Sequence, residues 1–235
     1  MSEDAEVAPL AAPLVNVDAG ELDDEPTELW SLAHVLHVAC GGHAGDDASM
    51  RRALGRAAEA GCRVGAHPSY PDREGFGRRA IALPSGALVE SLRAQCASLR
   101  AVAEQAGVAL SSLKPHGALY HDAAVSPALA RDLAELTREL LGPGAALVGP
   151  PQCALRDAAR DAGVPYLREG FADRGYAADG ALLPRSAEGA LLSAPATAVA
   201  QARALWATGA IDTLCVHGDN PAAVPLLRAL RAAFP

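Results

Sequence analysis

The chain alternates short apolar runs with longer segments in which apolar residues recur at helical spacing. Each apolar run has the length of a buried strand, and glycine or proline separates many of the units. The predicted strands are residues 14–18, 35–40, 62–66, 112–114, 146–148, 164–169 and 213–216, and the predicted helices are residues 27–36, 47–60, 85–105, 126–140, 151–162, 196–208 and 221–234. This repeated order of strand, loop and helix predicts an α/β protein with a parallel sheet covered by helices.

Seven parallel strands are compatible with a closed barrel or with an open sheet that carries helices on both faces. Polar residues follow most of the predicted strands, and the carboxyl ends of parallel strands converge on one face of a barrel. The sequence contains neither a GxGxxG loop after the first strand nor a GxxxxGK[ST] phosphate loop. We therefore expect an irregular seven-stranded β/α barrel formed by residues 14–235 as a single domain. The acidic, Ala/Pro-rich residues 1–13 should form a flexible tail.

The composition limits the binding partners and the cellular compartment that we expect for this protein. The 235 residues include 28 Asp and Glu against 20 Lys and Arg, which gives a formal net charge of −8 without a basic stripe. Nucleic acid and anionic membranes are therefore not expected as partners. No apolar run reaches the length of a membrane span. Because residues 1–13 lack the positive start of a signal peptide, we expect a cytoplasmic protein.

The five cysteines are widely spaced and form no CxxC pair. This spacing argues against a disulfide framework and against a zinc ribbon. Most of these cysteines should be small buried residues. Cys40 and Cys215 come at predicted strand ends beside histidines, where a nucleophilic role is the weaker alternative to packing.

The segment GAHPSYPDREGFGRR, residues 65–79, begins in a predicted buried strand and contains an imidazole, a tyrosine and charges of both signs. Its prolines fix φ and its glycines permit unusual φ, so it should form a loop. A loop of this kind directly after a buried strand is typical of a functional site. The alternative is a solvated loop with one or two surface ion pairs.

Ionisable and amide side chains gather at the predicted strand ends. Buried charges need a partner or a ligand, so this concentration predicts a polar bowl that holds an anionic or amide-bearing small molecule. A structural network of ion pairs is the alternative. The residues are Asn16, Asp18, Glu21, His43, Asp46, His67, Asp72, Arg73, Lys114, His116, Glu169, Asp173, Arg174, His217 and Asp219.

Side-chain chemistry suggests roles within the bowl. Asp18 and Asp173 could form a base and acid pair if their environments separate their pKa values. Lys114 or an arginine could bind a carboxylate or a phosphate. The histidines could transfer protons, ligate a metal or hydrogen-bond to the backbone. Asp18, His67 and His116 are weak candidates for a divalent metal site, since no HExxH motif is present.

Six motifs occur in a fixed order along the chain. They are NVDAGE at 16–21, VACGGHAGD at 38–46, GAHPSYPDREGFGRR at 65–79, KPHGALY at 114–120, FADRGYAADGALLPR at 171–185 and CVHGDNPAAV at 215–224. Together they resemble the LamB/YcsF family, which comprises the A subunits of 5-oxoprolinase, over nearly the whole chain from Leu14. Two departures stand out: Leu14-Val15 replaces the usual Asp-Leu of the first motif, and residues 186–212 form a shorter segment than in typical members.

The resemblance implies a β/α barrel of the glycoside hydrolase/deacetylase type. It also implies a cytoplasmic enzyme that opens the 5-oxoproline lactam to glutamate with ATP and Mg²⁺, together with separate B and C subunits. The matching polar residues imply two sets. The expected catalytic residues are Asp18, Glu21, His67, Lys114, His116 and Asp173, and the expected substrate-binding residues are Asn16, His43, Asp46, Arg73, Arg174, His217 and Asp219.

A lactam carbonyl is a poor electrophile, so we expect the partner subunits to phosphorylate its oxygen and this chain to open the ring. A carboxylate such as Asp18 or Asp173 would activate water. Lys114, Arg73 or Arg174 would hold the substrate carboxylate or the phosphate. Replacing Asp18 with Asn should then abolish glutamate formation with little loss of folding stability. Two alternatives stay open, a stand-alone metal-dependent amide hydrolase or deacetylase and a non-catalytic subunit that only binds substrate.

Overall fold

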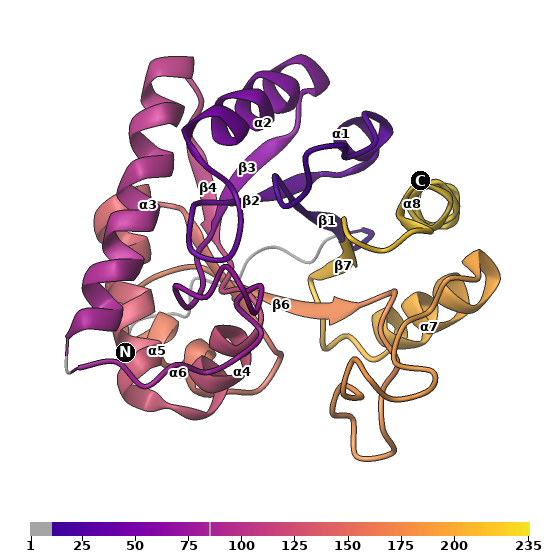
Figure 1. The fold of residues 1–235 in the computed structure, drawn as a ribbon. Coiled ribbons are helices and arrows are strands. Elements are labelled where there is room, and N and C mark those ends of the chain that lie inside the picture. The colour runs from indigo at the N-terminus through magenta and orange to yellow at the C-terminus, as the bar shows by residue number, and fades with distance from the viewer. Residues whose placement is uncertain (1–10, 85) are drawn as a thin grey trace.

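The computed structural model describes residues 11–84 and 86–235. Its strands form a closed parallel barrel in sequence order, and β1 closes the barrel by pairing with β7 (Figure 1). The strands are β1 Leu14–Ala19, β2 Val35–Ala39, β3 Arg63–His67, β4 Leu110–Leu113, β5 Ala146–Gly149, β6 Tyr166–Phe171 and β7 Thr213–His217. The predicted seven-stranded β/α barrel is confirmed, and the open-sheet alternative is wrong.

The amino-terminal segment lies mostly outside the described residues. The predicted tail of residues 1–13 includes residues 1–10, so the division into this tail and one domain of residues 14–235 stays a prediction. Within the described ranges, none of the helices combines the length and the apolar character needed to cross a membrane.

Helices surround the barrel on its outside (Figure 1). They are α1 Glu28–Leu32, α2 Asp47–Ala60, α3 Ala87–Ala106, α4 Ala118–Val125, α5 Pro127–Leu136, the π-helical turn η1 Thr137–Leu141, α6 Ala154–Ala162, α7 Pro195–Ala207 and α8 Ala223–Ala233. The apolar core lies between these helices and the strands, where Val15 and Val17 of β1 join Leu226 and Leu230 of α8. Alternation along each strand therefore leaves the other side chains for the barrel interior.

The barrel interior is polar. In β1, Asn16 and Asp18 alternate with the core valines, and both reach the amine of Lys114. His37 of β2 shares a hydrogen bond of 3.0 Å with Ser112 of β4. Strand alternation thus brings polar groups from distant parts of the sequence to one axis, which is the foundation of the site.

Local sequence explains where several helices begin and end. The Asp46 side chain accepts a hydrogen bond from the Ser49 backbone N–H at 2.8 Å, and the Asp46 backbone N–H donates to Ser49 Oγ at 2.8 Å. This reciprocal pair caps the first turn of α2. Gly61 ends α2 at φ 69°, a conformation that glycine adopts without strain.

Three helices differ most from the sequence prediction, and the bounds of several other elements, such as β6, shift by two or three residues. α1 ends at Leu32 rather than at residue 36, because β2 begins at Val35 and draws the following apolar residues into the barrel. α4 is absent from the prediction, since it begins after Gly117 without the side-chain cap that marks most helix starts. The helix predicted over residues 126–140 is α-helical only to Leu136 and then continues as η1.

Candidate active site

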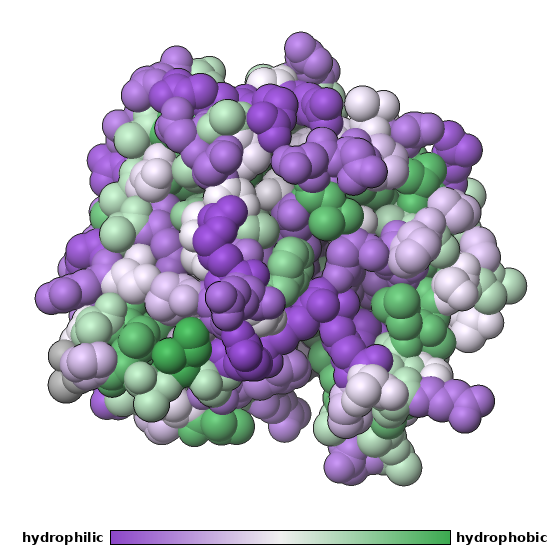
Figure 2. Space-filling view, in the orientation of Figure 1, coloured by the Kyte–Doolittle hydropathy of each residue, from purple (hydrophilic) through white to green (hydrophobic). Residues whose placement is uncertain are grey.

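A cavity of about 380 Å³ opens at the carboxyl ends of the strands. Hydrophilic side chains gather across the middle of the face shown in Figure 2. The cavity lining combines buried ionisable groups of the barrel with aromatic and aliphatic side chains. These residues include Asp18, His67, Lys114, His116, Phe171 and His217. The strand ends therefore converge on a cavity lined by both ionisable and apolar side chains.

Lys114 is the buried cation at the centre of the site. Its Nζ has four close neighbours, which are Asp18 Oδ1 at 2.8 Å, Glu169 Oε1 at 3.0 Å, Cys215 Sγ at 3.1 Å and Asn16 Oδ1 at 3.2 Å. Burial opposes the charge, but Asp18 and the other neighbours raise the pKa of Lys114 well above its ordinary value. Burial would also raise the pKa of Asp18, yet His67 and Lys114 hold it well below its usual range. Lys114 and Asp18 therefore stay ionised as a pair.

Three imidazoles converge on one carboxylate beside this pair. Glu21 Oε1 lies 2.9 Å from His43 Nε2, 3.2 Å from His116 Nδ1 and 3.7 Å from His67 Nε2. His67 Nε2 also lies 2.9 Å from His116 Nδ1 and 3.5 Å from Asp18 Oδ2. All of these side chains are buried. We call Glu21, His43, His67 and His116 the histidine cluster.

The members of the histidine cluster have different proton affinities. Burial lowers the pKa of His43 to about 4 and also lowers the pKa of His116. Burial has the same tendency at His67, but the neighbouring Asp18 carboxylate outweighs it and raises the pKa of His67. At Glu21, burial is outweighed by hydrogen bonds from His116 and His43, which lower its pKa far below the usual range. His67 is therefore the imidazole of the cluster that protonates most readily.

A second carboxylate, Glu25, holds the turn that carries Glu21. Its oxygens accept hydrogen bonds from the backbone N–H groups of Gly20, Glu21 and Leu22 at 2.9, 2.8 and 3.2 Å. Burial raises the pKa of Glu25. The sequence analysis missed Glu25 because several carboxylates of the run ELDDEP look alike, and only the folded turn selects one of them.

Arg73 and Asp46 support the loop that carries His43. Arg73 Nη1 donates to the carbonyl oxygens of Gly41 at 3.2 Å and Gly45 at 2.8 Å. Asp46 is exposed and caps α2. Neither side chain belongs to the cavity lining. The substrate-binding role expected for both residues stays a prediction; in the fold, Arg73 contacts the loop and Asp46 contacts the first turn of α2.

Asp72 fixes the loop after β3. Its carboxylate accepts from Arg79 Nη2 at 2.7 Å, Arg79 Nε at 3.1 Å and Gly75 N–H at 2.9 Å. The loop places Phe76 at φ 54°, and the Phe76 carbonyl accepts from His116 Nε2 at 2.9 Å. A non-glycine residue in this region carries strain of about 1 kcal/mol or more. This segment is therefore a built part of the site and not a merely solvated loop.

Asp173 is buried behind His217. Its Oδ1 accepts from His217 Nδ1 at 2.9 Å, and its Oδ2 accepts from His217 N–H at 3.0 Å and from Asn220 Nδ2 at 3.1 Å. Burial would raise the pKa of Asp173, but His217 and Asn220 lower it. Because Nδ1 donates to the carboxylate, Nε2 is the nitrogen that carries the lone pair in the neutral ring. His217 also lines the cavity. Phe171 stacks on this imidazole with ring centroids 5.5 Å apart.

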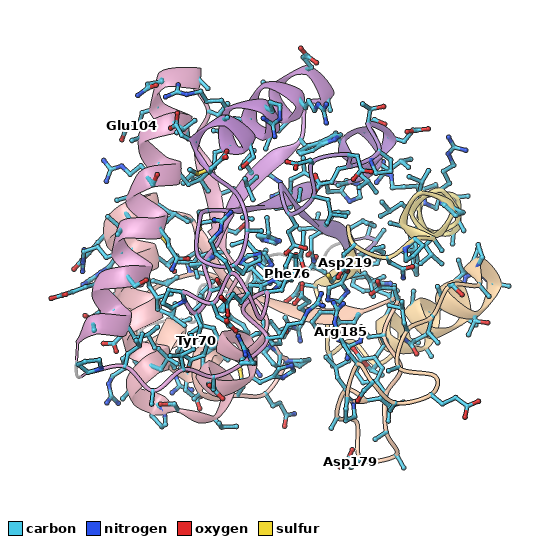
Figure 3. All side chains as sticks on the ribbon, viewed as in Figure 1. Tyr70, Phe76, Glu104, Asp179, Arg185 and Asp219 are labelled. Carbon is cyan, nitrogen blue, oxygen red and sulfur yellow. The ribbon has the colours of Figure 1, made fainter. Side chains whose placement is uncertain are left out.

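Arginines surround the cavity mouth. Arg78 and Arg185 both form ion pairs with Asp219, and Arg185 and Asp219 lie together near the centre of Figure 3. Arg174 instead donates to two backbone carbonyls of residues 183–190, which fastens that segment beside the cavity. Around the mouth, the three arginines Arg78, Arg174 and Arg185 therefore outnumber the two carboxylates of Asp122 and Asp219.

The structure brings most of the predicted site residues together. Those that line the cavity are Asp18, His67, Lys114, His116, Arg174 and His217. Those that contact lining residues or the histidine cluster are Asn16, Glu21, His43 and Asp173. Asp219 pairs with arginines at the mouth, and Asp46 and Arg73 lie outside the lining. Their individual catalytic and binding roles stay predictions. Tyr120, Phe171 and Asn220 were missed, although all three lie within the motifs noted above.

The cysteines show no sign of an activated thiol. All five are free, and Cys40, Cys96 and Cys215 are buried. Burial raises the pKa of Cys40 and of Cys215 well above the ordinary value. Because the thiolate is the nucleophilic form, the geometry favours packing over nucleophilic catalysis at both positions.

The histidine cluster does not fit the Mg²⁺ that the resemblance implies. Mg²⁺ prefers oxygen ligands in octahedral geometry, whereas three of the four converging donors are imidazole nitrogens. A second group of donors consists of Asp18, Cys215 and His217. There the ammonium of Lys114 already lies 2.8 Å from Asp18 Oδ1 and 3.1 Å from Cys215 Sγ. The Lys114 ammonium therefore already supplies the positive charge beside this second group of donors.

Comparison with known proteins agrees with this architecture. The LamB/YcsF family model matches residues 16–235. The 5-oxoprolinase A subunit of Symbiobacterium thermophilum is 42% identical over 221 residues, covering 87% of this chain and 83% of that protein. The 5-oxoprolinase A subunit of Chloroflexus aggregans is 43% identical over 240 residues, covering 92% of each.

A solved structure shows the same fold. It is the lactam utilization protein from Thermus thermophilus, which superposes with a TM-score of 0.85 at 33% sequence identity and covers 94% of this chain and 95% of that one. The family model, both sequence relatives and the solved structure thus each match most of this chain. The chain belongs to the LamB/YcsF family.

Proposed function

We propose that this chain is the lactam-opening subunit of an ATP-dependent 5-oxoprolinase, which converts 5-oxoproline to glutamate in the cytoplasm. Relatives that cover most of the chain are named as the A subunit of 5-oxoprolinase. The observation that carries the proposal is the Asp173–His217 pair, whose free imidazole nitrogen belongs to the same cavity as the ionised Lys114–Asp18 pair. This arrangement offers a base and a buried positive charge to one substrate.

The lining of the cavity matches the substrate class. 5-Oxoproline carries one carboxylate and one cyclic amide, and its phosphorylated form carries a second anionic group. Arg78 and Arg185 supply guanidinium groups at the mouth, which suit carboxylate and phosphate oxygens. Phe171, Tyr120 and Leu182 supply apolar surface for the ring.

Activation by ATP is assigned to the partner subunits. The sequence contains no glycine-rich phosphate loop, and the naming of the relatives as one lettered subunit implies a complex of several chains. In the proposed scheme, the B and C subunits bind ATP with Mg²⁺ and transfer phosphate to the lactam oxygen. This converts an unreactive amide carbonyl into an electrophilic imidate carbon.

The ring then opens by addition of water. His217 Nε2 takes a proton from water as its oxygen bonds to the ring carbon. As the carbon–nitrogen bond breaks, the ring nitrogen takes up two protons, one returned by His217 and one lost from the added hydroxyl as its oxygen becomes the carbonyl, which leaves an acyl phosphate of glutamate. A second water hydrolyses that acyl phosphate to glutamate and inorganic phosphate, so one ATP and two waters are consumed.

Asp18 is better suited to electrostatic support than to proton abstraction. Because its pKa lies well below the usual range, the carboxylate is a weak base. It holds Lys114 at 2.8 Å, and the Lys114 charge can stabilise negative charge that develops in the transition state. Asp173 acts on the cavity through His217, which it orients.

One observation favours a second candidate function. The histidine cluster could support a metal-dependent hydrolysis of an amide that needs no activation by ATP. This candidate predicts turnover by the isolated chain, whereas the proposed function requires ATP and the partner subunits.

The test is the release of glutamate and ADP from 5-oxoproline, ATP and Mg²⁺ in three mixtures: this chain alone, the B and C subunits alone, and all three chains together. We expect glutamate only from the complete mixture, and a loss of roughly 10²–10⁴ in turnover for folded His217→Gln. Glutamate formation by the isolated chain without ATP would favour the second candidate. A complete mixture that stays inactive, while the same B and C subunits work with the corresponding chain of a relative, would overturn the proposal.

A further inference from the structure

The histidine cluster forms a set of donors around one point in the protein interior. His43 Nε2, His67 Nε2, His116 Nδ1 and Glu21 Oε1 lie within 4.8 Å of one another. Ligand atoms of one tetrahedral Zn²⁺ ion lie about 3.3 Å apart, given bonds of about 2.0–2.1 Å. The separations from Glu21 Oε1 to the three nitrogens, 2.9, 3.2 and 3.7 Å, bracket that value.

Backbone carbonyls fix which nitrogen of two rings faces this point. His67 Nδ1 lies 2.8 Å from the Lys114 carbonyl, and His116 Nε2 lies 2.9 Å from the Phe76 carbonyl. A carbonyl oxygen only accepts, so each of these nitrogens carries the ring hydrogen. His67 Nε2 and His116 Nδ1 then face each other at 2.9 Å, with room for at most one proton between them. A divalent cation that displaces this proton would meet a lone pair on both nitrogens.

This pattern of outer hydrogen bonds is the one that metal-binding histidines use. A metal-ligating imidazole commonly donates its other N–H to a carbonyl or carboxylate, which fixes the ring and its tautomer. Phe76, whose carbonyl accepts from His116, is itself held at φ 54°. The next residue, Gly77, has room for no Cβ, since an added one would lie 2.9 Å from His43 Cβ and 3.0 Å from His116 Cδ2.

His43 supplies the fourth donor after a small movement. Its ring stacks on His116 with centroids 3.6 Å apart and an angle of 3° between the planes, so the two rings must splay to direct both lone pairs at one ion. Among the described residues, His43 Nδ1 is buried without a hydrogen-bond partner, so the rotation breaks no hydrogen bond at that nitrogen.

We infer that Glu21, His43, His67 and His116 form a binding site for one divalent transition metal ion of the Zn²⁺ class. Three imidazoles and one carboxylate suit Zn²⁺, Co²⁺ or Ni²⁺ and suit Mg²⁺ or Ca²⁺ poorly. His67 and His116 also line the cavity, so an ion bound here lies at the wall of the substrate site. Asp18 has its Oδ2 3.5 Å from His67 Nε2 and its Oδ1 on Lys114, so it supports the site rather than completing it.

Binding can be measured on the isolated full chain, without ATP, substrate or partners. The protein is stripped with a chelator and titrated with Zn²⁺ and Co²⁺ by calorimetry, with Mg²⁺ as the comparison. We expect one equivalent of Zn²⁺, visible Co²⁺ absorption typical of tetrahedral coordination, and no saturable Mg²⁺ binding. Because no turnover is involved, failure of metal binding and failure of the proposed reaction are separate outcomes.

Three variants locate the ion. Glu21→Gln and His116→Gln should each weaken Zn²⁺ binding by about 100-fold, while His121→Gln, a histidine beside the cavity but outside the cluster, should leave the affinity unchanged. X-ray absorption of the Zn²⁺-loaded wild type should show nitrogen and oxygen neighbours without sulfur, which needs no variant to fold. Absence of saturable Zn²⁺ and Co²⁺ binding to the folded wild type, a sulfur neighbour from Cys215, or full affinity in both ligand variants would each overturn the inference.

Discussion

Lys114 keeps its charge inside the barrel because the carboxylates of Asp18 and Glu169 lie 2.8 and 3.0 Å from its amine. Removing a charge from water costs several kcal/mol, so such a group stays ionised only with close partners. The arrangement leaves Asp18 a weak base and Lys114 a fixed positive centre. At the scale of single residues, the folded protein therefore fixes the ionised state of the buried Lys114–Asp18 pair before any ligand binds.

Asp18→Asn should reduce both turnover and stability. The substitution leaves Lys114 with one carboxylate fewer, which should lower the free energy of unfolding by about 1–3 kcal/mol. This differs from the sequence-based expectation of little loss, because the ion pair is visible only in the fold. Glutamate formation should fall by roughly 10²–10⁴. Urea unfolding and coupled turnover assays measure the two effects.

Asp212→Asn is the matched control for that variant. Asp212 pairs with Arg168 and is partly exposed outside the cavity lining, so its loss should leave turnover unchanged and cost less stability. A folded Asp18→Asn protein with full turnover would remove Asp18 from the catalytic centre.

Asp173→Asn should change how stability depends on acid. The folded pKa of Asp173 lies below its unfolded value of about 3.9, so the carboxylate stabilises the fold above that pH and loses this effect as pH falls through the folded pKa. At pH 7 the wild type should be more stable than the variant by about 1–3 kcal/mol. Urea unfolding between pH 7 and about 2 should show this gap narrowing as pH falls below the unfolded pKa of about 3.9 and towards the folded pKa. A gap that stays constant would mean that the Asp173 charge contributes nothing.

At the scale of elements, strands carry Asp18, His67 and His217, and fastened loops carry much of the rest of the site. Asp72 and Arg79 fasten the loop after β3, Arg73 fastens the loop after β2, and Glu25 fastens the turn after β1. The sequence indicated these loops through their glycines, prolines and charges. It did not indicate which charges face the cavity and which brace backbone, because both kinds follow strands in the same way.

Gly77→Ala should disturb the loop after β3 and the histidine cluster together. At φ 64° an alanine is strained, and its Cβ would lie 2.9 Å from His43 Cβ. We expect a loss of about 1–3 kcal/mol of stability and weaker Zn²⁺ binding. Thermal unfolding and metal titration measure both.

Gly55→Ala is the control substitution of the same type. Gly55 lies within α2, and an added Cβ meets nothing within 4 Å. Alanine there should stabilise the protein by about 0.5–1 kcal/mol, because glycine is costly in a helix. If Gly77→Ala behaves like Gly55→Ala, the tight contact at the cluster is not real.

At the scale of the whole molecule, β1 and β7 close the barrel and join the two ends of the described chain. Asn16 Nδ2 donates to Thr213 Oγ1 at 2.8 Å, and Leu14 N–H donates to the Asp212 carbonyl at 3.0 Å. Closure removes both sheet edges. The strands from the two ends of the chain therefore depend on each other for their backbone hydrogen bonds.

Closure predicts cooperative unfolding. The two tryptophans report on opposite parts of the sequence, since Trp30 lies in α1 and Trp206 lies in α7. Fluorescence of Trp30→Phe and Trp206→Phe should give urea midpoints that coincide with circular dichroism of the same variant. A fluorescence midpoint that differs from the circular dichroism midpoint of the same variant would show that the barrel unfolds in parts.

The sequence by itself determined the order of strands and helices, because hydrophobic periodicity and capping residues act over a few neighbouring positions. It also placed the polar motifs at the carboxyl ends of the strands. It did not indicate α4 at all, since no side-chain cap marks the start of that helix.

Only the tertiary structure decided which polar groups meet. The contacts of Lys114 with Asp18 and Asn16 join residues almost one hundred positions apart, and those of His43, His67 and His116 with Glu21 join four separate strand ends. Local sequence cannot specify such distances, because they depend on barrel closure, strand register and the backbone of each loop. Partner choice, burial and pKa follow from that packing.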